Sequence, residues 1–133
     1  MIVIFATLTS INRYVGLTVV KQSLASGNTS GLQWFMPYCW PSVMLAIEYL
    51  GWGFYFGLAC ISLAPAFVSG SLERAIFWTL LATGMLSLLS VIGQVLGANS
   101  LTFSLFTMAG VLGWGPGLTV ATFLISIWIR RKR

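Results

Sequence analysis

The amino-acid sequence predicts an all-α fold, a transmembrane helical bundle with four spans. Of its 133 residues, 58% are apolar and only 7% are charged, whereas soluble domains carry roughly 25% charged residues. The apolar residues come in blocks of about 20, the length of helix that crosses a hydrocarbon core roughly 30 Å thick. Because the chain lacks the charge to cover a surface in water, we expect a single integral membrane domain over residues 1–133.

Polar residues and prolines delimit the predicted spans. We expect the four spans at about residues 2–20, 42–63, 75–96 and 101–129. Lys21 and Gln22 close the first span, and Pro41 is suited to open the second because the first position of a helix needs no N–H. Pro65 stops the second span, and a Gly-Ala-Asn-Ser turn at residues 97–100 separates the third span from the fourth.

The fourth span contains a proline in the run Gly-Trp-Gly-Pro-Gly at residues 113–117. A proline inside a helix removes one backbone hydrogen bond and collides with the preceding turn. We therefore predict that the fourth helix is kinked or locally broken at Pro116, which would act as a helix hinge.

The positions of lysine and arginine predict an orientation. A basic cluster follows the fourth span directly and forms the predicted topology anchor: Arg130, Arg131, Lys132 and Arg133. If this cluster is inside, Arg74 is inside too and only Lys21 is outside, in agreement with the bias toward positive cytoplasmic loops. We therefore expect the protein in the cell membrane, with both its N- and C-termini in the cytoplasm.

The inventory of side chains excludes several kinds of site. The chain has no His and only two acidic residues, both Glu. Its two cysteines, Cys39 and Cys60, would lie about 30 Å apart along a helix, too far to form a disulfide. A structural zinc site and a Ser/His/Asp or Cys/His nucleophile are excluded, so we expect no catalytic residue, no metal and no cofactor. The net charge of +5 resides mainly in the C-terminal cluster, and we expect no nucleic-acid partner.

Polar residues of the third span recur at spacings of three and four and fall within roughly 80° of one another on a helix. We interpret this stripe as a packing surface, because small and hydroxylated residues line helix contacts in membranes. Pairs such as Gly53 with Gly57 and Gly113 with Gly117 offer matching close-approach surfaces. The members of the stripe are Thr79, Thr83, Ser87, Ser90 and Gln94.

Two charged residues, Arg13 and Glu48, fall inside the first and second spans at similar predicted depths. Charged side chains in a bilayer cost several kcal/mol and usually pair in the bundle interior. We predict an Arg13–Glu48 ion pair in the outer half of the membrane, with hydrogen bonds from Asn12 and Gln94. Tyr55 shares the Glu48 face of a regular helix and joins this intramembrane polar cluster. The alternative for Arg13 is that its long side chain reaches the outer head groups.

Three short runs, at residues 17–22 (LTVVKQ), 48–51 (EYLG) and 72–74 (LER), resemble segments of uncharacterised prokaryotic multi-pass membrane proteins. The resemblance covers most of the chain and implies an integral membrane location without implying an activity. Such proteins tend to carry additional N-terminal helices, and the first span begins at Met1 itself. The alternative to a single complete domain is therefore that this sequence is the C-terminal part of a longer multi-pass protein.

Two functions from different classes fit these observations. The first is a non-enzymatic structural or accessory bundle whose partners are the lipid bilayer and either a second copy or another membrane subunit. The alternative is a small transporter or ligand-binding bundle with a polar cavity around Arg13, Glu48 and Gln94. The sequence itself does not identify a small-molecule ligand.

Overall fold

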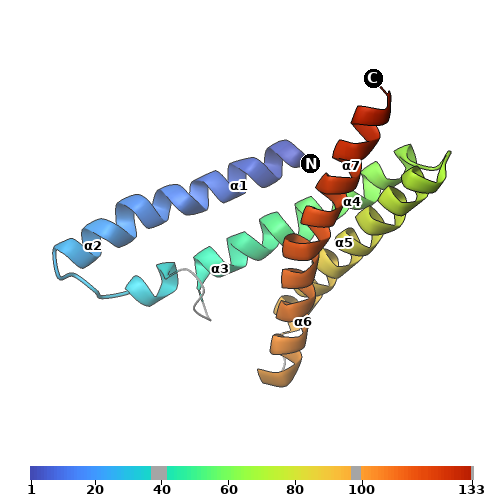
Figure 1. Cartoon of the computed structure of the whole chain (residues 1–133). Helices are drawn as coiled ribbons and strands as arrows, with labels where there is room; N and C mark the ends of the chain where they lie inside the picture. Colours follow the sequence, from blue (N-terminus) through green and yellow to red (C-terminus); the bar gives the residue numbers. More distant parts are fainter. Residues whose placement is uncertain (37–41, 97–99, 133) are drawn as a thin grey trace.

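The computed structural model describes residues 1–36, 42–96 and 100–132, and the described residues form helices and turns without a strand (Figure 1). Four helices are long and apolar enough to cross a membrane: the first at Ile2–Ala25, the second at Val43–Ala66, the third at Ser71–Leu96 and the fourth at 100–132, of which Ser104–Lys132 is the apolar span. The predicted transmembrane helical bundle with four spans is confirmed. The predictions made for Cys39, Pro41, the turn at 97–99 and Arg133 lie outside the described residues.

Three of the four helices change to π-helical geometry along part of their length. The first helix consists of α1 (Ile2–Val15), the π-helical η1 (Gly16–Val20) and α2 (Lys21–Ala25). The second consists of α3 (Val43–Glu48), the π-helical η3 (Tyr49–Tyr55), α4 (Phe56–Leu63) and a closing 3₁₀ turn, η4 (Ala64–Ala66). The third is the uninterrupted α5 (Ser71–Leu96), and the fourth consists of α6 (Ser100–Leu112), the π-helical η5 (Gly113–Gly117) and α7 (Leu118–Lys132). A short 3₁₀ segment, η2 (Leu32–Phe35), precedes the second helix.

The ends of the helices differ by a few residues from the predicted ones. The first helix continues past Lys21 and Gln22 to Ala25, because lysine and glutamine are good helix formers and end only the apolar part of the helix. The chain leaves this helix at Gly27, whose φ of +71° is a left-handed conformation that favours glycine. At the start of the second helix, the hydroxyl of Ser42 accepts a hydrogen bond from the backbone N–H of Leu45 at 3.3 Å.

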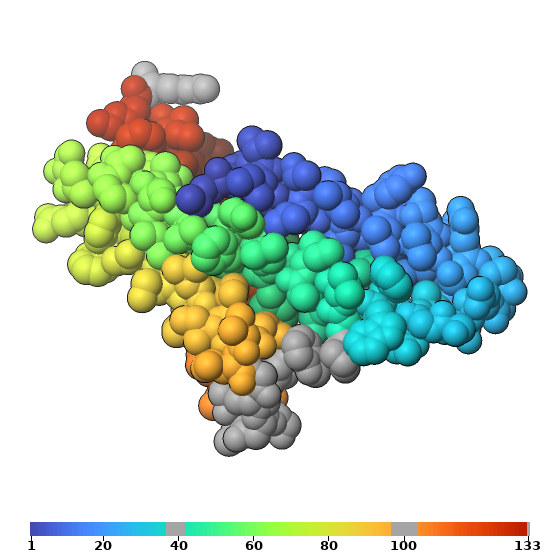
Figure 2. All heavy atoms as spheres, turned by 180° about the vertical axis from the view of Figure 1, so that it is seen from behind, coloured from blue at the N-terminus to red at the C-terminus, as the bar shows by residue number. Residues whose placement is uncertain are grey.

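The four helices do not contribute equally to the interior. The third helix packs against both the second and the fourth, whereas the first packs mainly along the second. Figures 1 and 2 show the first helix, in blue, lying beside the second helix on opposite views of the molecule. The second helix therefore contacts protein on two sides.

The hydroxyl stripe of the third helix is a packing surface. Ser87 and Ser90 are fully buried, and their hydroxyls donate to carbonyls of their own helix, Ser87 to Thr83 O at 2.8 Å and Ser90 to Ser87 O at 2.6 Å. Glycines of the neighbouring helices lie directly against it: a methyl group on Gly57 would be 3.1 Å from Ser87 Cβ, and one on Gly113 would be 3.0 Å from Ser87 Oγ. The predicted packing role is confirmed for Ser87 and Ser90, whose hydroxyls bond within their own helix rather than across the contact.

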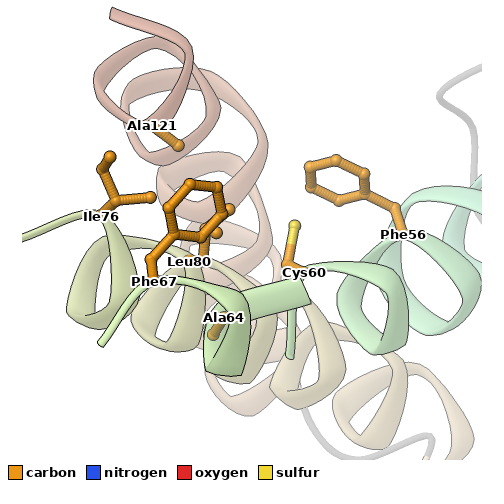
Figure 3. Close-up of a cluster of buried hydrophobic side chains, with 7 residues drawn as sticks. All are labelled: Phe56, Cys60, Ala64, Phe67, Ile76, Leu80 and Ala121. Atoms are coloured by element: carbon orange, nitrogen blue, oxygen red, sulfur yellow. The ribbon is translucent and has the colours of Figure 1, made fainter. Parts of the chain in front are cut away.

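A cluster of buried apolar side chains joins the second, third and fourth helices near the chain termini (Figure 3). Its members come from α4, the following connection, α5 and α7: Phe56, Cys60, Ala64, Phe67, Ile76, Leu80 and Ala121. Inside a membrane such contacts stabilise the bundle through close packing, because lipid chains are as apolar as these side chains.

A polar contact fastens the end of the fourth helix to the start of the third. Trp128 Nε1 donates to Glu73 Oε1 at 3.0 Å, and the Phe67 ring meets the Trp128 ring edge-on at a centroid distance of 5.3 Å. Lys132 Nζ lies 5.8 Å from the centroid of the same indole. The predicted anchor cluster thus begins directly beside this contact, with Arg130 and Arg131 exposed.

Pro116 lies within a continuous helix. The fourth helix keeps helical geometry through residues 113–117, where it widens into the π-helical η5. Proline cannot donate the normal backbone hydrogen bond, and a π turn is one way in which a helix accommodates such a defect. The predicted local discontinuity takes the form of this wider turn rather than a break, and a hinge motion at Pro116 stays a prediction.

Candidate ligand-binding groove

Arg13 and Glu48 form an ion pair between the first and second helices. Arg13 Nη2 lies 2.9 Å from Glu48 Oε1, close enough for a charge-assisted hydrogen bond. The Arg13 side chain is 55% exposed, whereas Glu48 is only 8% exposed. The carboxylate is the more buried partner. Removal of the guanidinium would therefore leave a buried charge without compensation for its lost hydration, which is costly in free energy.

The pair lies well inside the spanning segments. At 1.5 Å per residue, Arg13 is about 12 Å along the helix from Lys21, and Glu48 is about 8 Å from Val43 at the start of its helix. Asn12 sits beside the pair and is 2% exposed. Its side-chain N–H donates to the backbone carbonyl of Met44 at 3.1 Å, so it fastens the first helix to the second rather than hydrogen bonding to the carboxylate.

A groove of about 430 Å³ opens beside the ion pair. The first helix contributes Arg13 to its lining. From the second helix come Leu45, Glu48, Tyr49 and Trp52, and from the fourth come Thr107, Val111, Trp114 and Gly115. The third helix takes no part in the lining, so the groove lies at the side of the bundle and not along its packed interior.

Aromatic side chains connect the second helix to the fourth across the groove. The Tyr49 ring meets the Trp114 ring edge-on at 5.4 Å between centroids, and the Trp52 and Trp114 rings lie 6.2 Å apart. The Tyr49 hydroxyl donates to Thr107 Oγ1 at 3.1 Å. The groove therefore combines an apolar aromatic wall with one charged edge, the usual make-up of a small-molecule site.

Two buried polar atoms of the lining have no hydrogen-bond partner among the described residues. They are Glu48 Oε2, the carboxylate oxygen that does not face Arg13, and Trp114 Nε1. A buried acceptor or donor without a hydrogen bond lowers the stability of the folded protein by about 1–3 kcal/mol, and by more when the group is charged. A ligand that supplied one donor and one acceptor here would recover part of that cost.

Two residues of the predicted polar cluster lie elsewhere. Gln94 does not line the groove, although both polar atoms of its amide are buried. Tyr55 is also absent from the lining, and its ring packs edge-on against its neighbour Phe54 at 5.3 Å. Tyr55 leaves the Glu48 face because residues 49–55 are π-helical, and each residue of a π-helix turns through roughly 80° instead of 100°.

The residues that replace them are Tyr49, Thr107 and Trp114, which the sequence did not single out as members of a site. Trp114 stands in the Gly-Trp-Gly-Pro-Gly run, whose composition signals an irregular turn and thereby a possible place for function. Thr107 carries no comparable signal, because one threonine in an apolar helix is ordinarily a packing residue.

Fold and groove together define a class: a four-span helical membrane bundle with a charged, aromatic-lined groove on its side. No family model, curated protein or solved structure matches this chain.

Proposed function

We propose that the protein is a non-enzymatic membrane bundle that binds an amphiphilic ligand in the groove between its first, second and fourth helices. One observation carries the proposal: the buried Glu48 carboxylate directs one oxygen to Arg13 and leaves the other without a partner in the groove wall. Ionisable residues inside a membrane are costly and mark functional sites. Two glutamates and no histidine leave little acid–base chemistry, which supports binding over catalysis.

Binding is favoured over transport by the position of the groove. The middle of the bundle is filled by the contacts of Ser87 with Gly57 and Gly113, whereas the groove lies at the side, where lipid has access. A ligand can therefore enter and leave laterally without crossing the membrane.

The test of this function is the amphiphile that the protein retains. Purified protein is washed in mild detergent, extracted with organic solvent, and the extract is quantified by mass spectrometry. We expect about one bound amphiphile per wild-type protein and a loss of most of it in Glu48→Gln. Glu73→Gln is the matched control, because it removes the same charge from a glutamate outside the groove. Equal retention by the wild type and Glu48→Gln would refute the proposal.

A second candidate is a structural or accessory subunit that contacts another membrane protein or a second copy of itself. The close packing of Ser87 against Gly57 and Gly113 favours it, since such contacts build rigid scaffolds. This candidate predicts that Glu48→Gln lowers stability while the amount of retained lipid stays the same.

We extend the proposal to location and orientation: the cell membrane, with both termini cytoplasmic and the groove in the outer half. The distribution of Lys and Arg supports this orientation. Both termini also lie in the same part of the molecule as the connection between α4 and α5, as Figure 1 shows.

A further inference from the structure

The charges of the groove cancel within the protein. Among the described lining residues, Arg13 and Glu48 are the two that carry a charge, and they face each other at 2.9 Å. The hydroxyls of Tyr49 and Thr107 are joined to each other. Among the described lining residues, the polar side-chain atoms that are buried without a hydrogen-bond partner are one acceptor, Glu48 Oε2, and one donor, the N–H of Trp114.

We infer that the groove binds an uncharged lipid with a free hydroxyl head, such as a diacylglycerol or a long-chain alcohol. This inference rests on the proposed binding function and names its ligand class. A hydroxyl is a donor and an acceptor in one group, so it can donate to Glu48 Oε2 and accept from Trp114 Nε1. The aromatic wall formed by Trp52 and Trp114 then accommodates the start of the apolar chain.

The charge balance disfavours ionic head groups. A phosphate would have to compete with Glu48 for Arg13, and an amine would have to compete with Arg13 for Glu48. Either would leave a net charge in a region of low dielectric, which is expensive. An uncharged head adds no charge to the ion pair.

Depth in the membrane favours the same class of ligand. Glu48 lies about 8 Å along its helix from Val43, the first residue of the apolar span, so a head group must enter the apolar region to reach it. An uncharged hydroxyl lipid can descend to this depth because it has little hydration to lose. Both orphan atoms are screened from solvent in the present arrangement, so the head group reaches them through a rotation of the Glu48 and Trp114 side chains.

The experiment uses the full chain in nanodiscs of phosphatidylcholine and a photoactivatable diacylglycerol as the probe. Labelling is mapped to peptides and competed with unlabelled dioleoylglycerol, its O-methyl ether or dioleoyl phosphatidic acid. We expect labelling near residues 45–52 and 107–115, efficient competition by the alcohol, and weaker competition by the ether and the phosphatidic acid. The inference is overturned if the ether or the phosphatidic acid competes as well as the alcohol.

Tryptophan variants give a matched pair. Trp114→Phe removes the indole N–H and keeps an aromatic ring, so labelling should need a roughly two- to tenfold higher probe concentration, the range of one hydrogen bond. Trp78→Phe makes the same exchange on an exposed residue of the third helix and should leave labelling unchanged. Equal labelling of the two variants refutes the assigned role of the Trp114 N–H and with it the inferred head group.

Glu48→Gln distinguishes a ligand-binding role of Glu48 from a purely structural one. It removes the negative charge that faces Arg13 across the groove wall, so phosphatidic acid should become a better competitor than dioleoylglycerol. If instead the wild type retains an amphiphile with a charged head, the proposed binding function is supported and the inferred ligand class is refuted. If the wild type retains no amphiphile and is not labelled, both the binding function and the ligand class are refuted.

Discussion

Two glycines, each in a π-helical segment, provide the sharpest test of the packing described above. A methyl group on Gly113 would lie 3.0 Å from both Ser87 Oγ and the carbonyl oxygen of Thr83, whereas a methyl group on Gly16 would meet only the flexible end of Met44, at an ordinary contact distance of 3.5 Å. The Thr83 carbonyl belongs to a helix backbone and cannot move aside cheaply. Replacing either glycine by alanine gains up to about 1 kcal/mol of helix propensity, so this gain cancels when the two variants are compared.

The difference between Gly113→Ala and Gly16→Ala therefore reports the cost of overpacking. For a well-packed contact this cost is about 1–3 kcal/mol. We expect Gly16→Ala to match or slightly exceed the wild type in stability, and Gly113→Ala to fall below Gly16→Ala by that amount.

Reversible unfolding in mixed micelles with increasing dodecyl sulfate, followed by far-ultraviolet circular dichroism, measures the difference. Two variants that agree within about 0.3 kcal/mol, or a Gly16→Ala that is the less stable one, would refute the close approach of the third and fourth helices at Ser87.

Three further predictions concern the charged residues and the two ends of the chain. Arg13→Gln and Glu48→Gln should each destabilise the bundle by about 1–3 kcal/mol, less than for a fully buried pair because Arg13 is half exposed. The double variant should recover part of the loss, and additive effects in this double-mutant cycle would argue against the pair. Trp128→Phe removes the hydrogen bond to Glu73, so trypsin should cleave the C-terminal basic cluster faster than in Trp78→Phe; equal rates would mean that the contact does not hold α7. Epitope tags at the two termini should be digested together in inside-out vesicles and protected together in right-side-out vesicles, and opposite behaviour of the tags would contradict an even number of spans.

The spans could be predicted because the membrane imposes simple requirements on the sequence. A helix that crosses lipid must be apolar for about 20 residues, and this requirement is visible without knowledge of any contact. The exact helix ends were less predictable. Lys21 and Gln22 end the apolar stretch but favour helix, and the chain turns only at Gly27, where a positive φ is adopted.

The Arg13–Glu48 pair was predictable for a similar reason. Two charges at matching depth on neighbouring spans have few other ways to lower their energy. The position of Tyr55 was not, because its assignment to the cluster assumed a rotation of 100° per residue beyond Glu48. The π-helical turn at residues 49–55 changes this angle, and nothing in the sequence shows that a glycine-rich segment will widen rather than continue as an α-helix.

The wider turns explain why a groove exists beside the ion pair. Tyr49 and Trp52 belong to η3, while Trp114 and Gly115 belong to η5, so four of the lining residues come from π-helical segments of two different helices. Pro116 lacks an N–H and cannot complete the normal hydrogen bond to the carbonyl of Leu112, which accounts for a widened turn at this place. π turns concentrate at functional sites because they redirect side chains that a regular helix would orient differently. The bundle therefore has two different sides. On one side, glycines allow the third helix to approach its neighbours closely. On the other side lies a groove, and two of its lining residues, Glu48 and Trp114, each keep one buried polar atom without a hydrogen-bond partner among the described residues.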